Sequence, residues 1–388
     1  MSKKVLITAG EASGDLHGAN LVKAMRDAEP SISFRGVGSG YMREAGVQLL
    51  WDAAEMSVVG LSEVARHLGI ILKVFRKVRA TLRTWCPDLV ILIDYPEFNL
   101  LVAAKAKKLG IPVMYYISPQ IWAWRPGRIK TIRKRVDRMV VILPFEEVLY
   151  QESGVDASFV GHPLLDVVKV RDEKQLQRSH DARAGQRRLV GLLPGSRYSE
   201  LRALLPLMLD AARIVAEQMP EVHFLVSCAP TVQRQQVDSY IKATDLPLTV
   251  IQRNTHDAIQ MCEMVVAASG TVTLETAILG TPLVVVYKVH PLTYWFGKRL
   301  VRVKHVALVN LVAGEAVVPE LLQHDATAER IAGEVLAIVN NPKRLAWMRE
   351  RLSEVREKLG CPGASGRAAA IAIELMGGNG SEKKATTR

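Results

Sequence analysis

A glycine and hydroxyl turn at the end of a predicted strand is the first feature of the sequence that could perform chemistry. Ser269, Gly270 and Thr271 follow the apolar run 264–268 and open a helix-like segment. Glycine lets a ligand approach the backbone, and the free N–H groups at a helix start attract phosphate. Glu275 lies one turn later, where its carboxylate can accept hydrogen bonds from ribose hydroxyls. The stretch indicates a nucleotide site, although an ordinary helix cap beside a solvated glutamate gives the same pattern.

A second turn of the same kind favours the nucleotide interpretation. Gly195, Ser196 and Arg197 follow the predicted strand 189–193, and an arginine there can place its guanidinium fork on a diphosphate. Asn310 is a further candidate donor to phosphate. The predicted nucleotide-sugar site comprises Gly195, Ser196, Arg197, Ser269, Gly270, Thr271, Glu275 and Asn310.

Acidic and polar groups follow the first predicted strand, residues 4–9. The loop carries Glu11, Ser13, Asp15 and His17 and lacks the spacing of a dinucleotide-binding fingerprint. Its carboxylates would repel a diphosphate, so a sugar or another hydroxyl-bearing acceptor is the better match. A helix cap is an equally good interpretation of Asp15, and His17 fits an ordinary helix face.

Asp94 is the candidate general base. It comes directly after the buried run 89–93, and ligands of open parallel sheets bind beyond the carboxyl ends of the strands. Alternatively, Asp94 caps the following helix, or His17, Glu11 or Glu97 is the base. The predicted acceptor-binding residues are Glu11, Ser13, Asp15, His17, Glu97 and Asn99.

A basic amphipathic segment at residues 61–82 indicates an anionic surface. Its apolar residues recur at helical spacing and are flanked by lysine and arginine. Such a helix can lie on an anionic membrane or hold an acyl chain, and a core-facing helix with a solvated basic face is the alternative. Further on, Trp122 and Trp124 lie in a proline-bounded loop beside another basic cluster. The membrane or acyl candidates are Leu61, Val64, Leu68, Ile71, Leu72 and Phe75.

The composition is that of a folded protein long enough for two domains. The 388 residues are 49% hydrophobic and 23% charged, with a formal net charge of +12 that predicts an anionic partner. Zinc-finger spacing and RNA-binding aromatic motifs are absent from the sequence, so we expect membrane phosphates or anionic small substrates rather than nucleic acid. No apolar run reaches the length of a membrane-spanning helix and no signal-peptide core is present, so a cytoplasmic protein is expected. The four cysteines lack metal spacing, which favours reduced thiols.

Alternating strand and helix patterns predict an α/β fold of two Rossmann-like domains. The polar stretch 169–188 has no sustained apolar pattern and is the predicted linker. We expect an N-terminal acceptor-binding domain (1–168) that carries the membrane-facing helix and a C-terminal nucleotide-sugar domain (169–350). Helices at 351–376 should pack across domains or subunits, and 377–388 should form a disordered tail.

The combination of motifs resembles the lipid-A-disaccharide synthases, a family of inverting glycosyltransferases that serve the bacterial outer-membrane lipid pathway. The resemblance extends from about residue 3 to residue 376. Its motifs, in order, are Gly10-Glu11-Ala12-Ser13-Gly14-Asp15, Ile93-Asp94 with Phe98-Asn99, Ser118-Pro119 with Trp122-Ala123-Trp124, Gly161-His162, Leu193-Pro194-Gly195-Ser196-Arg197, Ala268-Ser269-Gly270-Thr271 with Glu275, and Asn310-Leu311.

The resemblance implies the glycosyltransferase B fold, with the acceptor on the N-terminal domain and a UDP-sugar on the C-terminal one, facing a cleft. It implies transfer of 2,3-diacylglucosamine from UDP to 2,3-diacylglucosamine 1-phosphate, forming a β-1,6-linked disaccharide phosphate and UDP. It implies neither a metal nor another cofactor. A peripheral location on the cytoplasmic face of the inner membrane, and a homodimer that exchanges C-terminal segments, are also implied.

Two other functions fit part of the pattern. A UDP-sugar 2-epimerase of the same fold would use the site around Glu275, but it has no need of an apolar basic helix. A non-catalytic lipid-binding module at the membrane surface would need neither Asp94 nor two nucleotide turns.

Overall fold

The computed structural model describes residues 2–56, 64–124, 126–172, 188–288 and 304–382. The chain divides into two compact units, which we call unit 1 (residues 1–163 and 360–388) and unit 2 (residues 164–359). Unit 2 is therefore inserted into unit 1 between Pro163 and Gly360. Most of the expected linker falls at residues 173–187, outside the described residues.

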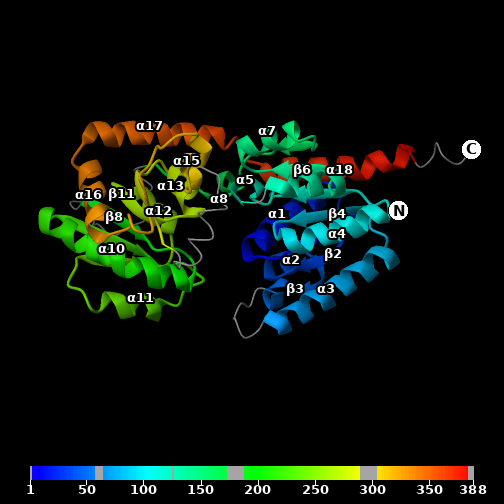
Figure 1. The fold of residues 1–388 in the computed structure, drawn as a ribbon, viewed down its shortest axis with the longest axis horizontal. Helices are drawn as coiled ribbons and strands as arrows, with labels where there is room; N and C mark the ends of the chain where they lie inside the picture. The colour runs from blue at the N-terminus through cyan, green and yellow to red at the C-terminus, as the bar shows by residue number, and fades with distance from the viewer. Residues whose placement is uncertain (1, 57–63, 125, 173–187, 289–303, 383–388) are drawn as a thin grey trace, which may run out of the picture. The chain divides into compact units, whose positions relative to one another are not determined.

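Unit 1 is built on a sheet of parallel strands in the order β3-β2-β1-β4-β5-β6-β7 (Figure 1). A parallel sheet is covered on both faces, so its strands are continuous apolar runs. In β4, Val90 and Leu92 enter one hydrophobic core and Leu89, Ile91 and Ile93 enter the other. The strands are β1 (Lys4–Ala9), β2 (Ser33–Gly38), β3 (Gln48–Asp52), β4 (Leu89–Ile93), β5 (Val113–Tyr116), β6 (Arg138–Val141) and β7 (Ala157–Phe159).

Helices fill both faces of this sheet. Helices α3, α4 and α6 supply the core that contains Val90, and α1 and α18 supply the core that contains Ile91. The helices of unit 1 are α1 (Ala12–Ala28), α2 (Gly40–Glu44), α3 (Val64–Thr84), α4 (Pro96–Lys108), α5 (Ile121–Trp124), α6 (Ile129–Arg135), α7 (Pro144–Glu152) and α18 (Ala364–Glu382).

Unit 2 repeats the plan with a parallel sheet in the order β10-β9-β8-β11-β12-β13. In both sheets the strand order reverses beside the first strand, which is where open α/β sheets bind ligands. The strands are β8 (Arg188–Leu193), β9 (Val222–Ser227), β10 (Leu248–Ile251), β11 (Met264–Ala268), β12 (Leu283–Tyr287) and β13 (Glu320–Leu322). The helices are α8 (Leu164–Val167), α10 (Tyr198–Gln218), α11 (Arg234–Ile241), α12 (Thr255–Met261), α13 (Val272–Ile278), α15 (Leu308–Ala313), α16 (Ala328–Val339) and α17 (Pro342–Lys358).

The two sheets with their helices confirm the predicted fold class. The C-terminal helices differ from the expected division at residue 350, because α17 runs through that position and packs on α13, α15 and α16 of unit 2. Pro342 separates α17 from α16, since proline starts a helix but cannot continue one. Helix α18 returns to unit 1 and lies against α1, so the red end of the chain in Figure 1 joins the blue elements.

Candidate active site

The turn after β4 presents Asp94 at the point where the strand order of the first sheet reverses. Asp94 and Tyr95 both have left-handed backbone, with φ of 50° and 44°. Non-glycine residues rarely adopt this conformation, which costs roughly 1–2 kcal/mol per residue, so it persists only where neighbouring groups fix it. Asn99 Nδ2 and the Tyr115 hydroxyl fix it here, donating to the Asp94 carbonyl oxygen at 2.6 and 2.5 Å.

The carboxyl of Asp94 is a weaker acid than that of an ordinary aspartate. Burial, together with the negative charges of Glu11 and Glu97, raises its pKa from 3.8 to about 6. A carboxylate with a pKa near 6 is a stronger base than an ordinary aspartate and is still ionised at neutral pH. The geometry gives Asp94 the properties that a general base requires.

The loop after β1 lies against the Asp94 turn. A Cβ atom on Gly10 would come within 2.4 Å of Tyr95 Cγ, so glycine is needed for the Tyr95 ring to pack there. On its other side, Tyr95 contacts Phe98, with ring centroids 6.1 Å apart. The close approach explains how Glu11, which follows Gly10 and is exposed, reaches the electrostatic environment of Asp94.

Two predicted acceptor residues have structural roles instead. The Asp15 carboxylate is buried and accepts backbone N–H bonds from Ser39 at 2.5 Å and Tyr41 at 2.9 Å, so it caps α2. Asn99 is buried too, and its amide is used by the carbonyls of the Asp94 turn and by Thr8 Oγ1, which donates to Asn99 Oδ1 at 2.7 Å. The polar groups of both residues are used in hydrogen bonds within unit 1, so they are not available to a ligand.

The other predicted acceptor residues differ in their availability. Ser13 and Glu97 are exposed, and Glu97 forms an ion pair with Arg128. Burial lowers the pKa of His17 to about 4 and that of His162 to about 3, where the nearby His17 adds to the effect. Both imidazoles are therefore neutral near pH 7.

Unit 2 contains a cavity of about 730 Å³ at the carboxyl ends of β8 and β11, which are neighbours in the sheet. The two hydroxyl-bearing turns found in the sequence meet there. Above Gly270, a Cβ atom would meet nothing within 4 Å, so a ligand can approach its backbone. The predicted residues that line the cavity are Gly195, Ser196, Arg197, Ser269, Gly270, Thr271 and Glu275.

Charged and polar side chains line this cavity. His256 Nε2 lies 3.2 Å from Glu275 Oε2, which orients the carboxylate in the first turn of α13. Lys169 and Arg171 add positive charge to the wall, and Arg171 Nε pairs with Asp257 Oδ1 at 2.9 Å. Sequence reasoning missed Lys169 and Arg171 as site residues, because two cations in a polar stretch carry no motif.

The exposed Arg197 side chain already forms an ion pair with a carboxylate of unit 2. Its Nη1 lies 2.8 Å from Glu200 Oε1, and the Ser196 and Arg197 N–H groups donate to Glu200 Oε2 at 3.0 and 3.2 Å. The Arg197 guanidinium is the group that we expected from the sequence to bind a diphosphate. A bound diphosphate must therefore share these donors with Glu200 or displace it.

Asn310 does not take the phosphate-binding place expected for it. It is fully buried, its Oδ1 accepts from Val317 and Val318 N–H at 2.9 and 3.0 Å, and its Nδ2 donates to Val318 O and Glu320 Oε1. It does not belong to the cavity lining. Every donor and acceptor of its amide is used to fold its own loop, so its role is structural.

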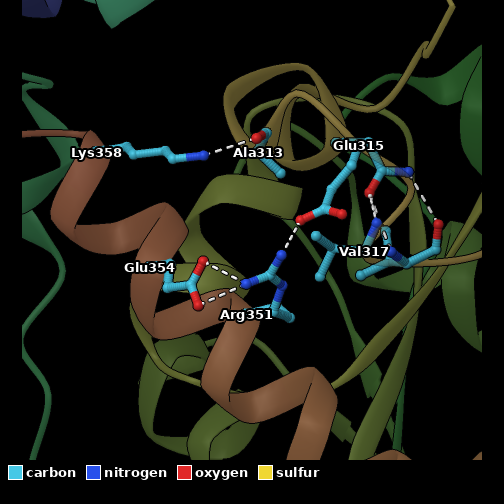
Figure 2. A network of polar contacts seen from close by, with 8 residues as sticks. Ala313, Glu315, Val317, Arg351, Glu354 and Lys358 are labelled. Atoms are coloured by element: carbon cyan, nitrogen blue, oxygen red, sulfur yellow. Dashed lines mark hydrogen bonds and ion pairs between the residues drawn. The ribbon is translucent and has the colours of Figure 1, made fainter.

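The loop after Asn310 is tied to α17 by charged groups (Figure 2). Arg351 Nη1 donates to Glu354 Oε1 at 2.7 Å, its Nη2 pairs with Glu315, and Lys358 Nζ donates to Ala313 O at 2.7 Å. This network fixes the end of α15 within unit 2.

The candidate membrane residues of α3 lie partly against the hydrophobic core and partly on the surface. Ile71 and Phe75 are partly buried against the core, and the Phe75 ring meets Phe98 edge-on with centroids 6.2 Å apart. Leu72 is 50% exposed. Leu61 lies outside the described residues, as do the side chains of Val64 and Leu68. The core-facing alternative therefore holds for Ile71 and Phe75, and Leu72 alone of the described candidates points to solvent.

A buried carboxyl in α7 was also missed by sequence reasoning. Glu146 Oε1 accepts hydrogen bonds from Ser118 Oγ at 2.6 Å and Trp122 Nε1 at 3.0 Å, which anchors the tryptophan loop. Burial raises the pKa of Glu146 to about 7. A glutamate in an amphipathic helix is normally solvated, so its buried position could not be predicted from the sequence.

The described residues include neither a candidate membrane-spanning helix nor a candidate metal-binding group. Within the described ranges, no helix has the length and hydrophobicity needed to cross a bilayer. The same part of the chain contains no group of three histidine, cysteine or acidic side chains placed to bind a metal.

A family model and curated relatives both match nearly the whole chain. A family model described as lipid-A-disaccharide synthetase matches residues 5–373. The lipid-A-disaccharide synthase of Syntrophus aciditrophicus is 53% identical over 376 residues, covering 97% of this chain and 98% of that protein. That of Geobacter metallireducens is 46% identical over 376 residues, with the same coverage.

Solved structures with much lower sequence identity share the fold. The glycosyltransferase of kitacinnamycin has a TM-score of 0.65 at 14% identity, covering 97% of this chain and all of that one. The S. aureus MnaA-UDP co-structure has a TM-score of 0.60 at 13% identity, covering 94% of each chain. At this identity they show the fold alone, which solved structures of glycosyltransferases and of a UDP-N-acetylglucosamine 2-epimerase share.

Proposed function

Because the chain belongs to the lipid-A-disaccharide synthase family, we propose that its unit 1 holds an acylated sugar acceptor at Asp94 and its unit 2 holds the UDP-sugar donor. It is a glycosyltransferase of lipid A biosynthesis, and the epimerase alternative is not favoured, since epimerases share only the fold. The substrates we assign are UDP-2,3-diacylglucosamine and 2,3-diacylglucosamine 1-phosphate.

In the reaction we propose, the Asp94 carboxylate accepts the proton of the acceptor's C6 hydroxyl. The hydroxyl oxygen then attacks the anomeric carbon of the donor, and the bond from that carbon to the UDP oxygen breaks. A single displacement inverts the anomeric configuration and gives the β-1,6 linkage. The departing UDP carries the negative charge, and the proton remains on Asp94.

The groups of the unit 2 cavity suit the donor. Glu275, held by His256 at 3.2 Å, can accept bonds from the ribose hydroxyls. Ser269, Thr271 and the open backbone of Gly270 can contact the diphosphate, and nearby cations can stabilise its charge as it leaves. The chain's own positive groups thus offer the electrostatic stabilisation that metal ions supply in other transferases.

The observation that carries the proposal is the half-buried Asp94 carboxyl on its left-handed turn, with a pKa near that of an effective general base. The test is an incubation of wild type and D94N with both substrates, followed by chromatography of the disaccharide phosphate. We expect D94N to lose activity by about 10²- to 10⁴-fold, the usual contribution of a general base, while its UDP affinity by calorimetry is unchanged. The controls E97Q and E11Q keep Asp94 and should remain active, and near-normal turnover by D94N would transfer the role to another residue.

We further propose that α3 contacts an anionic membrane. Exposed Leu72 is accompanied on the helix by the exposed cations Lys73, Arg76, Arg79 and Arg83. Lysine and arginine near an anionic leaflet contribute about 1 kcal/mol each, and leucine adds apolar contact. Sedimentation with phosphatidylglycerol vesicles tests this.

The double variant L72S/R76Q should bind the vesicles less than wild type, and R213Q, which alters an exposed arginine of unit 2, is the matched control. Equal binding by all three proteins would remove α3 as the contact.

The proposed assembly is a homodimer that exchanges the C-terminal segment. Ala368, Ala369 and Ala372 of α18 are buried in the core beside α1. The same small-residue face can pack onto α1 of a second chain. Light scattering gives the mass, and a cysteine pair engineered across α1 and α18 would link two chains in an exchanged dimer but would link within one chain otherwise.

A further inference from the structure

Two side chains hold the turn that presents Asp94 by donating to its backbone carbonyl oxygen, and Asn99 Nδ2 also donates to the Ile93 carbonyl at 3.0 Å. The carbonyl of Asp94 accepts the Tyr115 hydroxyl at 2.5 Å and Asn99 Nδ2 at 2.6 Å. Tyr115 is fully buried and Asn99 is 1% exposed, so water does not compete for either bond. A carbonyl oxygen has two lone pairs, and both are used here.

This oxygen controls the orientation of the turn. It belongs to the peptide between Asp94 and Tyr95, the two residues with left-handed backbone. Neither is glycine, so without outside contacts this peptide plane would favour other orientations. The Asp94 side chain leaves the chain at the Cα atom that begins this peptide, so a turn that settled into other backbone dihedrals would direct the carboxylate differently.

The hydroxyl of Tyr115 reaches the turn from the neighbouring strand. Tyr115 lies in β5, opposite Leu92 of β4, and its ring is packed in the hydrophobic core. Asn99 reaches the turn from α4, and its amide is oriented by Thr8 Oγ1 of β1 at 2.7 Å. Rigid elements on both sides therefore fix the turn, which is the arrangement that a precisely placed reacting group needs.

We propose that Tyr115 is a positioning residue that fixes the Asp94 carboxylate for proton abstraction, with Thr8 acting through Asn99 from the opposite side. The inference rests on the proposed role of Asp94 as the base. It adds that the reaction rate depends on a buried phenol that does not touch the substrate.

The test is the Tyr115→Phe variant, which removes one oxygen atom and leaves the ring in the core. We expect kcat to fall about tenfold, the rate equivalent of one buried hydrogen bond, with KM for both substrates unchanged. The acidic limb of the kcat profile should also shift to lower pH, because a freer carboxylate is better solvated. A merely structural role would lower the melting temperature but move neither kcat per folded molecule nor the pH profile.

Two further variants make the outcome decisive. Tyr116→Phe removes a buried hydroxyl from the adjacent strand position, whose side chain lies in the other core, and should leave kcat unchanged. Thr8→Val keeps the side-chain shape but frees the Asn99 amide, so it should lower kcat even if Tyr115→Phe is recovered poorly.

The results separate this inference from the proposed function. Wild-type kcat and pH profile in both Y115F and T8V, with D94N inactive, would overturn the inference and leave Asp94 as the base. An active D94N would instead show that the proposed function of Asp94 is wrong.

Discussion

Replacing Asp94 by asparagine should make the protein inactive but more stable. Burial and the charges of Glu11 and Glu97 raise the Asp94 pKa from 3.8 to about 6. Since one pKa unit corresponds to about 1.4 kcal/mol, ionised Asp94 is about 3 kcal/mol less favourable in the folded protein than in the unfolded chain. Asparagine cannot ionise, has nearly the same shape, and tolerates left-handed backbone, so D94N should escape this cost.

The sign of the effect depends on pH. Well below pH 3.8, Asp94 is protonated in both the folded and the unfolded chain, so its ionisation makes no difference between the stabilities of wild type and D94N. As the pH rises from about 4 to about 6, the unfolded chain loses the proton first and wild-type stability falls relative to D94N. Above pH 6 the difference should be constant at about 3 kcal/mol, less whatever solvent reaches the carboxylate.

The assay is differential scanning calorimetry of both proteins between pH 4 and pH 8, with the difference in Tm plotted against pH. E97Q is the control, because the Glu97 carboxylate is exposed and should give a much smaller pH-dependent difference. If D94N melts at or below the wild-type temperature at pH 8, ionised Asp94 does not destabilise the folded protein and the reasoning is refuted.

Three other predictions test the remaining assignments. Glu275→Gln should weaken UDP binding by about 10- to 100-fold in calorimetry, because hydrogen bonds to a charged group contribute roughly 1.5–3 kcal/mol, and unchanged affinity would exclude it from the ribose site. Asn310→Ala should leave UDP affinity unchanged but lower the free energy of unfolding by about 3 kcal/mol, since it strands the buried N–H groups of Val317 and Val318; a selective loss of UDP binding would restore its phosphate role. Burial raises the Glu146 pKa from 4.5 to about 7, so wild-type stability should fall as the pH rises through this interval, and Glu146→Gln should abolish that fall in Tm measured against pH. Parallel Tm curves for the two proteins would contradict the buried position of Glu146.

The parts of the site that the sequence predicted are those in which neighbouring residues act together. A buried strand followed by Gly270 and its flanking hydroxyls gives a local signal, and the parallel sheet then brings this turn beside the one at Gly195. The placement of Asp94 after a strand was predictable for the same reason. In each case the strand end fixes where the side chain lies.

Residues whose partners are distant in the chain were harder to interpret. Asp15 was an open choice because the helix it caps begins 25 residues later. Asn310 was assigned to phosphate because no local sequence pattern predicts that the Val317 and Val318 N–H groups donate to its side chain. From the sequence, Tyr115 is predicted only to be a core residue of a strand. Its hydrogen bond to the Asp94 carbonyl depends on the pairing of β4 with β5, which the sequence does not show.

The return of α18 to α1 affects the order in which a ribosome can complete the fold. The first unit lacks its covering helix until residues 364–382 have been made, and all of residues 164–359 are synthesised in between. At roughly 5–20 residues per second, this interval lasts on the order of 10 to 40 s. During that time the face of α1 that packs on α18 remains without its native cover. The inserted unit can therefore fold first, and a nascent chain with an open α1 face is the species for which chaperones, or a second chain, would compete.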